Sequence, residues 1–342
     1  MRTADLIQHS APVIGDEEVE AVSRVLYSGC IAQGPEVEAF EEECAAFIGR
    51  RHAVAVSSGT AALHLALNAL GVDERSTVAA PSYACASLLT AISLQRAKPY
   101  LCDVGPDFNL DTRTLPQEVD ATIVPHLFGA PAQVPPGPAV IEDIAQSFGG
   151  PTGSHAPLAI TSFYATKMMT TGEGGMVLTD DEAIAEHVRD RRDYDNREDF
   201  RDRFNYKLTD IQAALGRVQL NRLPSFIARR REIAAQYLVA FRDLPLELPK
   251  PRGHVFYRFV VSTNLRDKLE EHLQTQGIEA KRPVHRPAHH YLKNGDLGKT
   301  ADGQGSYPGS ERAHKCALSL PIHPNMLDED VEGVVDSVRE FY

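Results

Sequence analysis

The sequence is short of several residue types that define other protein classes. It has no tryptophan and only five cysteines, an odd number, among 342 residues. Cys30, Cys44, Cys85, Cys102 and Cys316 are widely separated, and no CxxC pair occurs among them. This distribution is not the pattern of a disulfide framework or a zinc module, so we expect reduced thiols, no metal site and a cytoplasmic protein.

Long apolar runs and basic clusters are also missing. The longest apolar stretch, 61–72, is interrupted by His64 and Asn68, so we expect no segment that spans a bilayer. The first twelve residues lack the basic and apolar regions of a signal peptide. Lys and Arg total 35 against 47 Asp and Glu, a net charge of -12, so we expect neither nucleic acid nor a membrane as a partner.

The chain does contain an alternation of short apolar segments with helical patterns. Four apolar segments bounded by turn residues predict strands, at 77–81, 99–104, 121–125 and 139–143. Apolar residues also recur at helical spacing, as in 36–48, where Gly49 ends the pattern. Strands this apolar are typical of a mostly parallel sheet covered by helices on both faces, so we predict an α/β fold.

The C-terminal part has a different pattern. At roughly 150 residues per domain, the chain has room for about two domains. A capping-box pattern at 209–212 predicts a helix start, and Pro224 predicts a break, with a second helix over 225–241. A predicted strand and two further helices follow. We therefore predict a large α/β domain over 1–235 and a smaller α+β domain over 236–342.

The segment Ser57-Ser58-Gly59-Thr60 lies between a predicted strand and a predicted helix. Backbone N–H groups at a helix N-terminus, with hydroxyl side chains and a glycine that permits close approach, form an anion or phosphate site. The same residue types also serve as an ordinary helix cap. The segment alone does not decide between these uses.

Two further positions carry groups suited to chemistry. Asp143 follows an apolar strand at the predicted carboxyl edge of the sheet, where open α/β folds place ligands, and Gln146 lies one turn further on. An aspartate there is also a common helix cap. Lys167 lies between an apolar segment that includes Ser162 and a glycine-rich turn. A lysine in a desolvated pocket loses basicity and forms Schiff bases with carbonyl compounds.

Together these features favour pyridoxal 5'-phosphate (PLP) as a cofactor. A phosphate-binding turn, a carboxylate for the pyridinium nitrogen and a lysine for the aldehyde are the groups by which proteins hold PLP. Asp143 would keep the ring nitrogen protonated. Lys167 would hold the cofactor and then act as general base and acid on the substrate carbon.

Eight motifs between residues 33 and 324 resemble those of one known family. They are QGPEVEAFEEECAAFIG, AVAVSSGTAALHLAL, PSYACAS, VPHLFG, VIEDIAQSFG, SFYATKMMTTGEGGMV, NYKLTDIQAALGRVQL and YPGSERAHKCALSLPIHP. With them the chain resembles the DegT/StrS family of PLP-dependent sugar aminotransferases, of the aspartate-aminotransferase fold type. The resemblance implies an amino donor such as L-glutamate and a keto-sugar acceptor linked to a nucleotide, in amino-sugar or natural-product biosynthesis.

The resemblance also implies roles for single residues. Lys167 would be the Schiff-base lysine and Asp143 the partner of the ring nitrogen. Gln146 would contact the phenolic oxygen of the ring, and Tyr83 would stack on the ring face.

The cofactor phosphate would be bound by four residues of the same chain, namely Ser58, Gly59, Thr60 and Ser162. Asn205 would reach the phosphate in the neighbouring subunit. The resemblance therefore implies a homodimer with shared active sites.

Two of the chain's departures from the family pattern concern residues of possible function. Lys207 stands where arginine is usual, so a guanidinium contact is lost there. The basic loop 282–290 is unusual, and its Arg282, His285 and Arg286 either bind an anionic substrate group or belong to a solvated loop. We predict no metal site from its histidines, because a proline interrupts the helix and no carboxylate partner is near.

Two other functions remain compatible with these residues. One is a PLP enzyme that acts on a non-sugar ketone or catalyses dehydration or cyclisation. The family's sugar dehydratases have histidine in place of the lysine, whereas this chain keeps Lys167. The other is a non-enzymatic PLP-binding regulator, which the retention of Lys167, Asp143, Gln146 and the phosphate residues disfavours.

Overall fold

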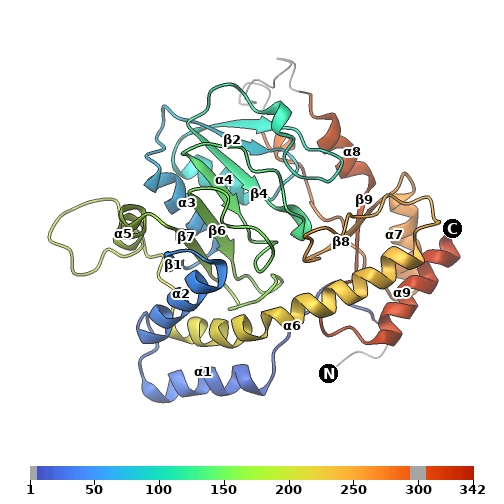
Figure 1. The fold of residues 1–342 in the computed structure, drawn as a ribbon, viewed down its shortest axis with the longest axis horizontal. Helices are drawn as coiled ribbons and strands as arrows, with labels where there is room; N and C mark the ends of the chain where they lie inside the picture. The colour runs from blue at the N-terminus through green and yellow to red at the C-terminus, as the bar shows by residue number, and fades with distance from the viewer. Residues whose placement is uncertain (1–5, 293–305) are drawn as a thin grey trace.

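The computed structural model describes residues 6–292 and 306–342. Its central element is a seven-stranded sheet with the order β1-β7-β6-β5-β4-β2-β3 (Figure 1). The strands of this sheet are β1 (His52–Val56), β2 (Thr77–Pro81), β3 (Lys98–Cys102), β4 (Ala121–Pro125), β5 (Val140–Asp143), β6 (Leu158–Ser162) and β7 (Gly175–Thr179). Only the pairs made by β7 are antiparallel among them, which confirms the prediction of a mostly parallel sheet.

Helices cover both faces of this sheet. The α-helices are α1 (Asp16–Ser28), α2 (Pro35–Ile48), α3 (Gly59–Ala69), α4 (Ser87–Leu94), α5 (Glu182–Arg191), α6 (Asp210–Ala240), α7 (Arg266–Thr275), α8 (Pro308–Cys316) and α9 (Asp328–Phe341). Short 3-10 helices are η1 (Thr112–Thr114), η2 (Leu127–Gly129) and η3 (Ala288–His290).

Strand β1 shows how the two faces are built. Val54 and Val56 belong to the apolar core on the α3 side, whereas Ala53 and Ala55 belong to the core that includes Phe40 of α2. Successive side chains of a strand point to opposite faces, so a fully apolar strand is buried on both. This explains why the strand segments are continuous apolar runs in the sequence.

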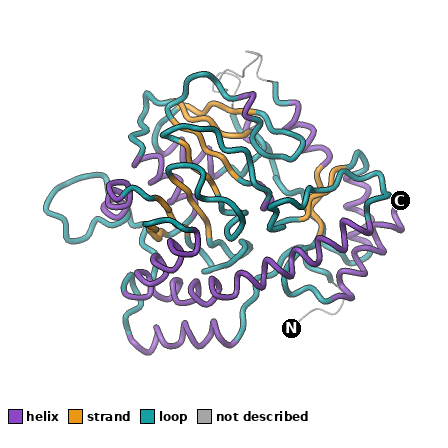
Figure 2. Tube along the Cα trace, viewed as in Figure 1, coloured by secondary structure: helices purple, strands orange, loops and turns teal. Residues whose placement is uncertain are grey.

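A second, two-stranded sheet lies near the C-terminus (Figure 2). It consists of β8 (Phe259–Ser262) and β9 (Ala317–Leu320), which pair in antiparallel fashion. Its core includes Tyr237 from the C-terminal half of α6 and Val334 from α9. The residues of this core come from both sides of position 235.

Helix α6 differs from the sequence prediction. It runs unbroken through Pro224, so the predicted break and second helix were wrong. A proline inside a helix removes one backbone donor and costs about 3 kcal/mol. Here Leu223 and Phe226 beside it are buried, and their packing offsets that cost. The division of the chain at residue 235 stays a prediction, and that position lies inside α6.

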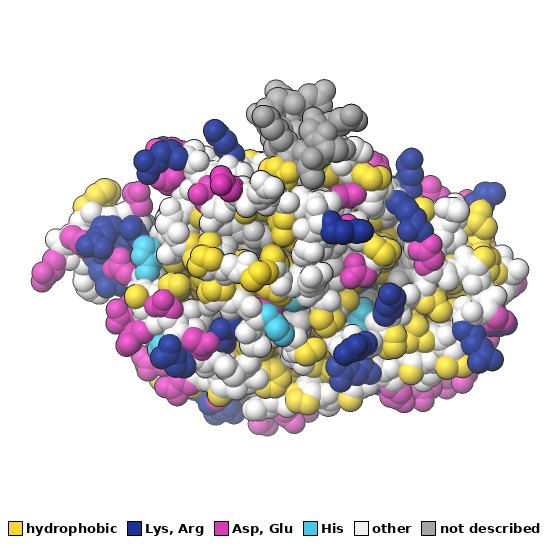
Figure 3. Space-filling view, turned by 45° about the horizontal axis from the view of Figure 1, so that its top comes forward, with side chains coloured by type: hydrophobic (Ala, Val, Ile, Leu, Met, Phe, Trp, Pro, Cys, Tyr) yellow, Lys and Arg dark blue, Asp and Glu magenta, His cyan; other side chains and the backbone are white. Residues whose placement is uncertain are grey.

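The surface of the described residues carries charges of both signs. On the face shown in Figure 3, Lys and Arg side chains are interspersed with Asp and Glu. Among the helices that the structure describes, none combines the length and the apolar character needed to cross a lipid bilayer.

Candidate active site

A cavity of about 250 Å³ opens at the carboxyl edge of the large sheet, beside the N-terminus of α3. It is lined by Ser58, Gly59, Thr60, Leu63, Ala84, Cys85, Ser87, Leu88, Pro125, His126, Leu127, Asp143, Ala145, Gln146, Ile160, Ser162, Tyr164, Lys167 and Glu173. Open α/β sheets place ligands at this edge, because strand ends and helix N-termini meet there.

Seven residues that were predicted from the sequence line this cavity. They are Ser58, Gly59, Thr60, Asp143, Gln146, Ser162 and Lys167. Strand register explains their convergence, since the last residues of β1 and β6 both pair with Gly175 of β7. Segments that lie far apart in the sequence therefore end side by side.

The N-terminus of α3 forms one wall. Ser58 is its N-cap, and the Ser58 hydroxyl accepts a hydrogen bond of 3.1 Å from the N–H of Ala61. A Cβ added at Gly59 would lie 2.7 Å from the Cβ of Ser162, so glycine permits this close approach. The first turn of a helix carries unpaired N–H groups and a positive partial charge, so this wall suits a phosphate.

Asp143 ends β5 with its side chain at the cavity. It is 9% exposed, and its Oδ1 accepts the N–H of Ala145 at 3.0 Å. Burial raises the pKa of Asp143, while the Ala145 hydrogen bond and the charge of Lys167 act in the opposite direction. A cationic group beside this carboxyl would favour its ionised form.

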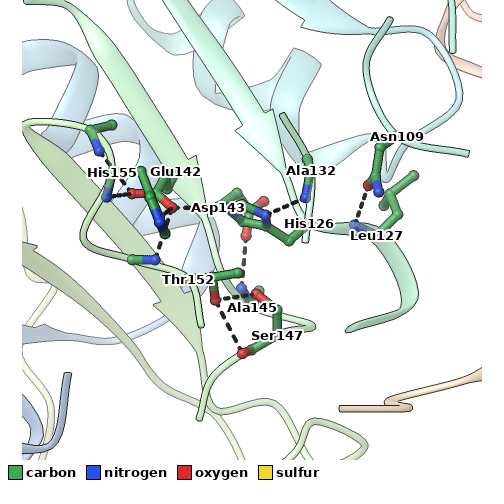
Figure 4. Close-up of polar contacts among 12 residues, drawn as sticks. Asn109, His126, Leu127, Ala132, Glu142, Asp143, Ala145, Ser147, Thr152 and His155 are labelled. Carbon is green, nitrogen blue, oxygen red and sulfur yellow. Dashed lines mark hydrogen bonds and ion pairs between the residues drawn. The ribbon is translucent and has the colours of Figure 1, made fainter. Parts of the chain in front are cut away.

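The residue before Asp143 anchors the strand end. Glu142 is fully buried, and its carboxylate accepts backbone N–H groups from Gly153 at 2.8 Å, His155 at 2.6 Å and Ala156 at 2.9 Å (Figure 4). Burial alone would raise the pKa of Glu142, but hydrogen bonds from His126 and these amides lower it to about 2. Glu142 is therefore a fixed negative charge that holds the loop after β5.

His126 joins this anchor to the cavity wall. The N–H of Ala132 donates to its Nδ1 at 2.8 Å, so the ring proton is assigned to Nε2, which donates to Glu142 at 3.1 Å. The backbone N–H of His126 also donates to the carbonyl of Asp143 at 3.0 Å. These bonds fix the ends of β4 and β5 relative to each other.

Lys167 lies in the loop between β6 and β7, where it is half-buried. Its Nζ is 5.3 Å from the ring centroid of Tyr257, whose hydroxyl is 3.3 Å from Oγ1 of Thr166. Burial alone would raise the pKa of Tyr257, but the charges of Lys167 and Arg258 and the Thr166 hydrogen bond lower it to about 8. A lysine at the cavity wall is thus packed against a buried phenol.

Tyr83 is not among the residues that line the cavity, and its stacking on a cofactor ring stays a prediction. It is 1% exposed, and its hydroxyl donates to the carbonyl of Ala313 at 3.4 Å. Two residues further on, Cys85 lines the cavity with an exposed side chain. The segment after β2 therefore turns its aromatic side chain toward α8 and its thiol toward the site.

Asn205 lies outside the cavity and is exposed, so its predicted contact with a partner's cofactor stays a prediction. The neighbouring Lys207, which replaces the usual arginine, forms ion pairs with Asp193 at 2.6 Å and Asp195 at 2.9 Å. Its ammonium group holds the charged loop that follows α5.

The basic loop is not part of the cavity wall either. Arg282, His285 and Arg286 are exposed and do not line the cavity. Arg282 pairs with Asp267 at 3.2 Å, and Arg286 donates to the carbonyl of His290 at 2.6 Å. The structure does not bring these three residues to the predicted site, so their binding of substrate stays a prediction.

Several cavity residues were not identified from the sequence. His126 follows β4 as Asp143 follows β5, so the same edge-of-sheet argument applies to it. Glu173 lies in the glycine-rich turn after Lys167, and this position in the sequence also makes it a candidate site residue. Tyr257 does not line the cavity but lies beside Lys167, and no local sequence pattern predicts this contact, because it joins distant segments.

The cavity residues fit the predicted cofactor. The approach of Gly59 to Ser162 leaves no room for a side chain beside the helix N-terminus, as a phosphate cradle requires. An acidic group with a raised pKa and a lysine meet in the same cavity. PLP combines a phosphate, a basic ring nitrogen and an aldehyde, for which these three features are the complementary groups.

Comparison with known proteins gives an independent result. A model of the DegT/DnrJ/EryC1/StrS aminotransferase family matches residues 12–339. Similar solved structures cover nearly all of the chain. S. venezuelae DesV, crystallised in complex with a ketimine intermediate, is 33% identical with a TM-score of 0.86, over 95% of this chain and 94% of that chain.

Two further structures agree with this match. The aminotransferase TlmJ from Streptoalloteichus hindustanus is 29% identical with a TM-score of 0.86, over 98% of each chain. A DegT DnrJ EryC1 StrS aminotransferase from Brucella abortus is 27% identical with a TM-score of 0.85, over 95% of each chain.

Proposed function

The chain belongs to the DegT/DnrJ/EryC1/StrS aminotransferase family, and from this premise we propose that it transfers an amino group from L-glutamate to a nucleotide-linked keto-sugar. The observation that carries the proposal is the convergence of Lys167, Asp143 and the N-terminus of α3 on one cavity. Each of these three features suits a different part of PLP.

The residues of this chain have separate tasks in the proposed reaction. When bound, PLP supplies an aromatic electron sink. Lys167 holds the cofactor aldehyde and moves a proton to and from the substrate carbon. Asp143 stabilises positive charge on the ring nitrogen, and Glu142 with His126 keeps the strand end that carries it in place.

The wall formed by α3 binds the phosphate in this proposal. Ser58, Gly59, Thr60 and Ser162 supply hydroxyl and N–H donors, and the helix dipole adds favourable charge. Gln146 lines the cavity, and its Oε1 accepts the N–H of Phe128 at 2.7 Å. That bond orients the Gln146 side chain, which we assign to the phenolic side of the ring.

Absorption spectroscopy of the PLP-loaded protein tests the donor half of the reaction. We expect a visible band that L-glutamate converts to a near-ultraviolet band, and that Lys167→Ala lacks. A keto-sugar nucleotide should then restore the visible band, whereas the free keto-sugar should do so less well. A visible band that amino donors leave unchanged would contradict transamination.

We further propose that the active unit is a homodimer in which Asn205 serves the partner's site. The exposed position of Asn205, outside the cavity of its own chain, supports this arrangement. Exposed Phe200, in the loop that precedes it, offers an apolar contact for a second copy. Mixing Lys167→Ala with Asn205→Ala subunits should generate one intact site per mixed dimer and raise activity above either parent. Activity equal to the mean of the two parents would reject shared sites.

A further inference from the structure

Two histidines of η3 meet a glutamate of α8 outside the cavity. His289 Nε2 lies 2.8 Å from Oε1 of Glu311, and His290 Nε2 lies 2.6 Å from the same oxygen. One ligand atom from each residue falls within 4.8 Å of the other two. The side chains are 12%, 30% and 40% exposed, respectively, so a small ion in solution reaches the cluster.

This arrangement corrects an expectation from the sequence. The histidines of the basic loop were expected to have no carboxylate partner, but α8 places Glu311 against both of them. Two imidazoles and one carboxylate form a donor set that suits Zn²⁺. Tetrahedral zinc with bonds of about 2.1 Å places ligand atoms about 3.4 Å apart, so small side-chain rotations admit the ion.

The outer contacts of His289 match those of a metal ligand. Its Nδ1 lies 2.5 Å from Oγ of buried Ser82, and its ring stacks on Tyr307 with centroids 4.5 Å apart. A serine hydroxyl both donates and accepts, so Ser82 supports the tautomer that leaves Nε2 free for a metal.

We propose that His289, His290 and Glu311 bind one Zn²⁺ ion, with water completing its coordination. The ion would join η3 to α8 and, through Ser82, brace the segment that leads to Cys85 in the cavity wall. The N–H of Ala288 already donates to the carbonyl of Ser82 at 2.6 Å, so this segment and η3 are in direct contact. The zinc site is structural and does not depend on the identity of the amino acceptor.

Calorimetric titration of tag-free, PLP-loaded protein with ZnCl₂ in a phosphate-free buffer tests the site. We expect one ion per chain. Glu311→Gln keeps the size and an acceptor oxygen but removes the charge, and we expect it to weaken zinc binding by at least about 100-fold, as we do for His290→Ala. Ser82→Ala, which removes an outer contact, should weaken zinc binding by about 10-fold.

Exposed thiols are competing zinc ligands, so Cys30→Ser and Cys85→Ser are matched controls, together with His52→Asn on the distant β1. All three should leave the zinc affinity unchanged. Zinc should also raise the Tm of the unmodified protein and leave that of Glu311→Gln unaltered, a comparison that holds only for folded variants with a normal cofactor band. Absence of saturable binding, or binding that only the cysteine variants abolish, would overturn the proposal.

Discussion

The polar side chains at the carboxyl edge of the large sheet and those of the 282–290 loop are positioned by different means. Asp143 and Ser162 are the last residues of buried strands, so the backbone ladder fixes where they lie. His289 is positioned by side-chain contacts with Ser82 and Glu311, which come from distant segments. A residue that is positioned by the backbone ladder keeps its place when one neighbouring side chain is substituted. A residue that is positioned by side-chain contacts loses its place when any of the contacting residues is substituted.

The largest effect is expected at the lysine of the sheet edge. Lys167→Ala should reduce kcat by at least about 10³-fold, because the group that holds the aldehyde and moves the proton is lost. The fold should stay intact, since the strands rather than this side chain shape the cavity. Activity assays and the loss of the visible cofactor band are the measurements.

Lys167→Arg is the matched control, because it keeps a positive charge beside Tyr257 but forms no Schiff base. It should be as inactive as the alanine variant. Retention of a tenth of the native activity in either variant would show that another group performs the chemistry.

The next largest effect is expected at Asp143. Asp143→Asn keeps an oxygen for the Ala145 N–H but removes the charge, so kcat should fall by about 10²-fold. The same substitution should increase the stability of the cofactor-free protein, because burial raises the pKa of Asp143 in its folded state. As pH rises above the ordinary Asp pKa of about 3.9, ionisation of the buried Asp143 carboxyl lowers the free energy of unfolding of the native protein. Asparagine does not ionise and avoids this loss.

Thermal unfolding of both cofactor-free proteins checks this sign. The Tm of Asp143→Asn should exceed that of the native protein at neutral pH, and the difference should disappear as pH falls toward 4. A difference that grows on acidification would mean that the folded carboxyl is stabilised in its charged form.

These variants bear on how much the sequence could predict. Fold class, strand positions and seven cavity residues were predictable, because an apolar strand followed by Asp or Ser places that side chain at a known edge. The stacking role of Tyr83 stays a prediction, since the direction of a side chain in a loop depends on its tertiary neighbours. The contact of Glu311 with His289 and His290 was not predicted. Glu311 lies 22 and 21 residues from these histidines, a separation that no helix or strand periodicity connects. The break at Pro224 was predicted wrongly, because helix rules based on the local sequence do not include the burial of the neighbouring side chains.

A smaller effect, on stability, is expected at the strand anchor. Glu142→Gln places an NH₂ group against backbone donors and should lower the free energy of unfolding at pH 7 by about 3 kcal/mol. The pKa of Glu142 falls from 4.5 to about 2, so its stabilisation is present above pH 4.5 and is lost as pH falls toward 2. Urea unfolding should show a smaller difference in the free energy of unfolding between the native protein and Glu142→Gln at pH 4 than at pH 7.

Glu186→Gln, on an exposed position of α5, is the control for the loss of one negative charge. It should change the free energy of unfolding by less than about 0.5 kcal/mol at both pH values. An equal effect of both substitutions would assign the change to net charge rather than to the buried hydrogen bonds.

The smallest effect is expected in the loop. Arg282 is 43% exposed and pairs with Asp267, which is 72% exposed, at 3.2 Å. Solvent-exposed ion pairs contribute about 0–1 kcal/mol, so Arg282→Ala should alter the free energy of unfolding by less than about 1 kcal/mol. Because the guanidinium is already engaged outside the cavity, the KM for the acceptor should change by less than about twofold with kcat unaltered. A tenfold rise in KM at constant kcat would instead mean that the loop binds the anionic part of the acceptor. Side-chain contacts would then help to build the active site as well as the proposed zinc site of His289, His290 and Glu311.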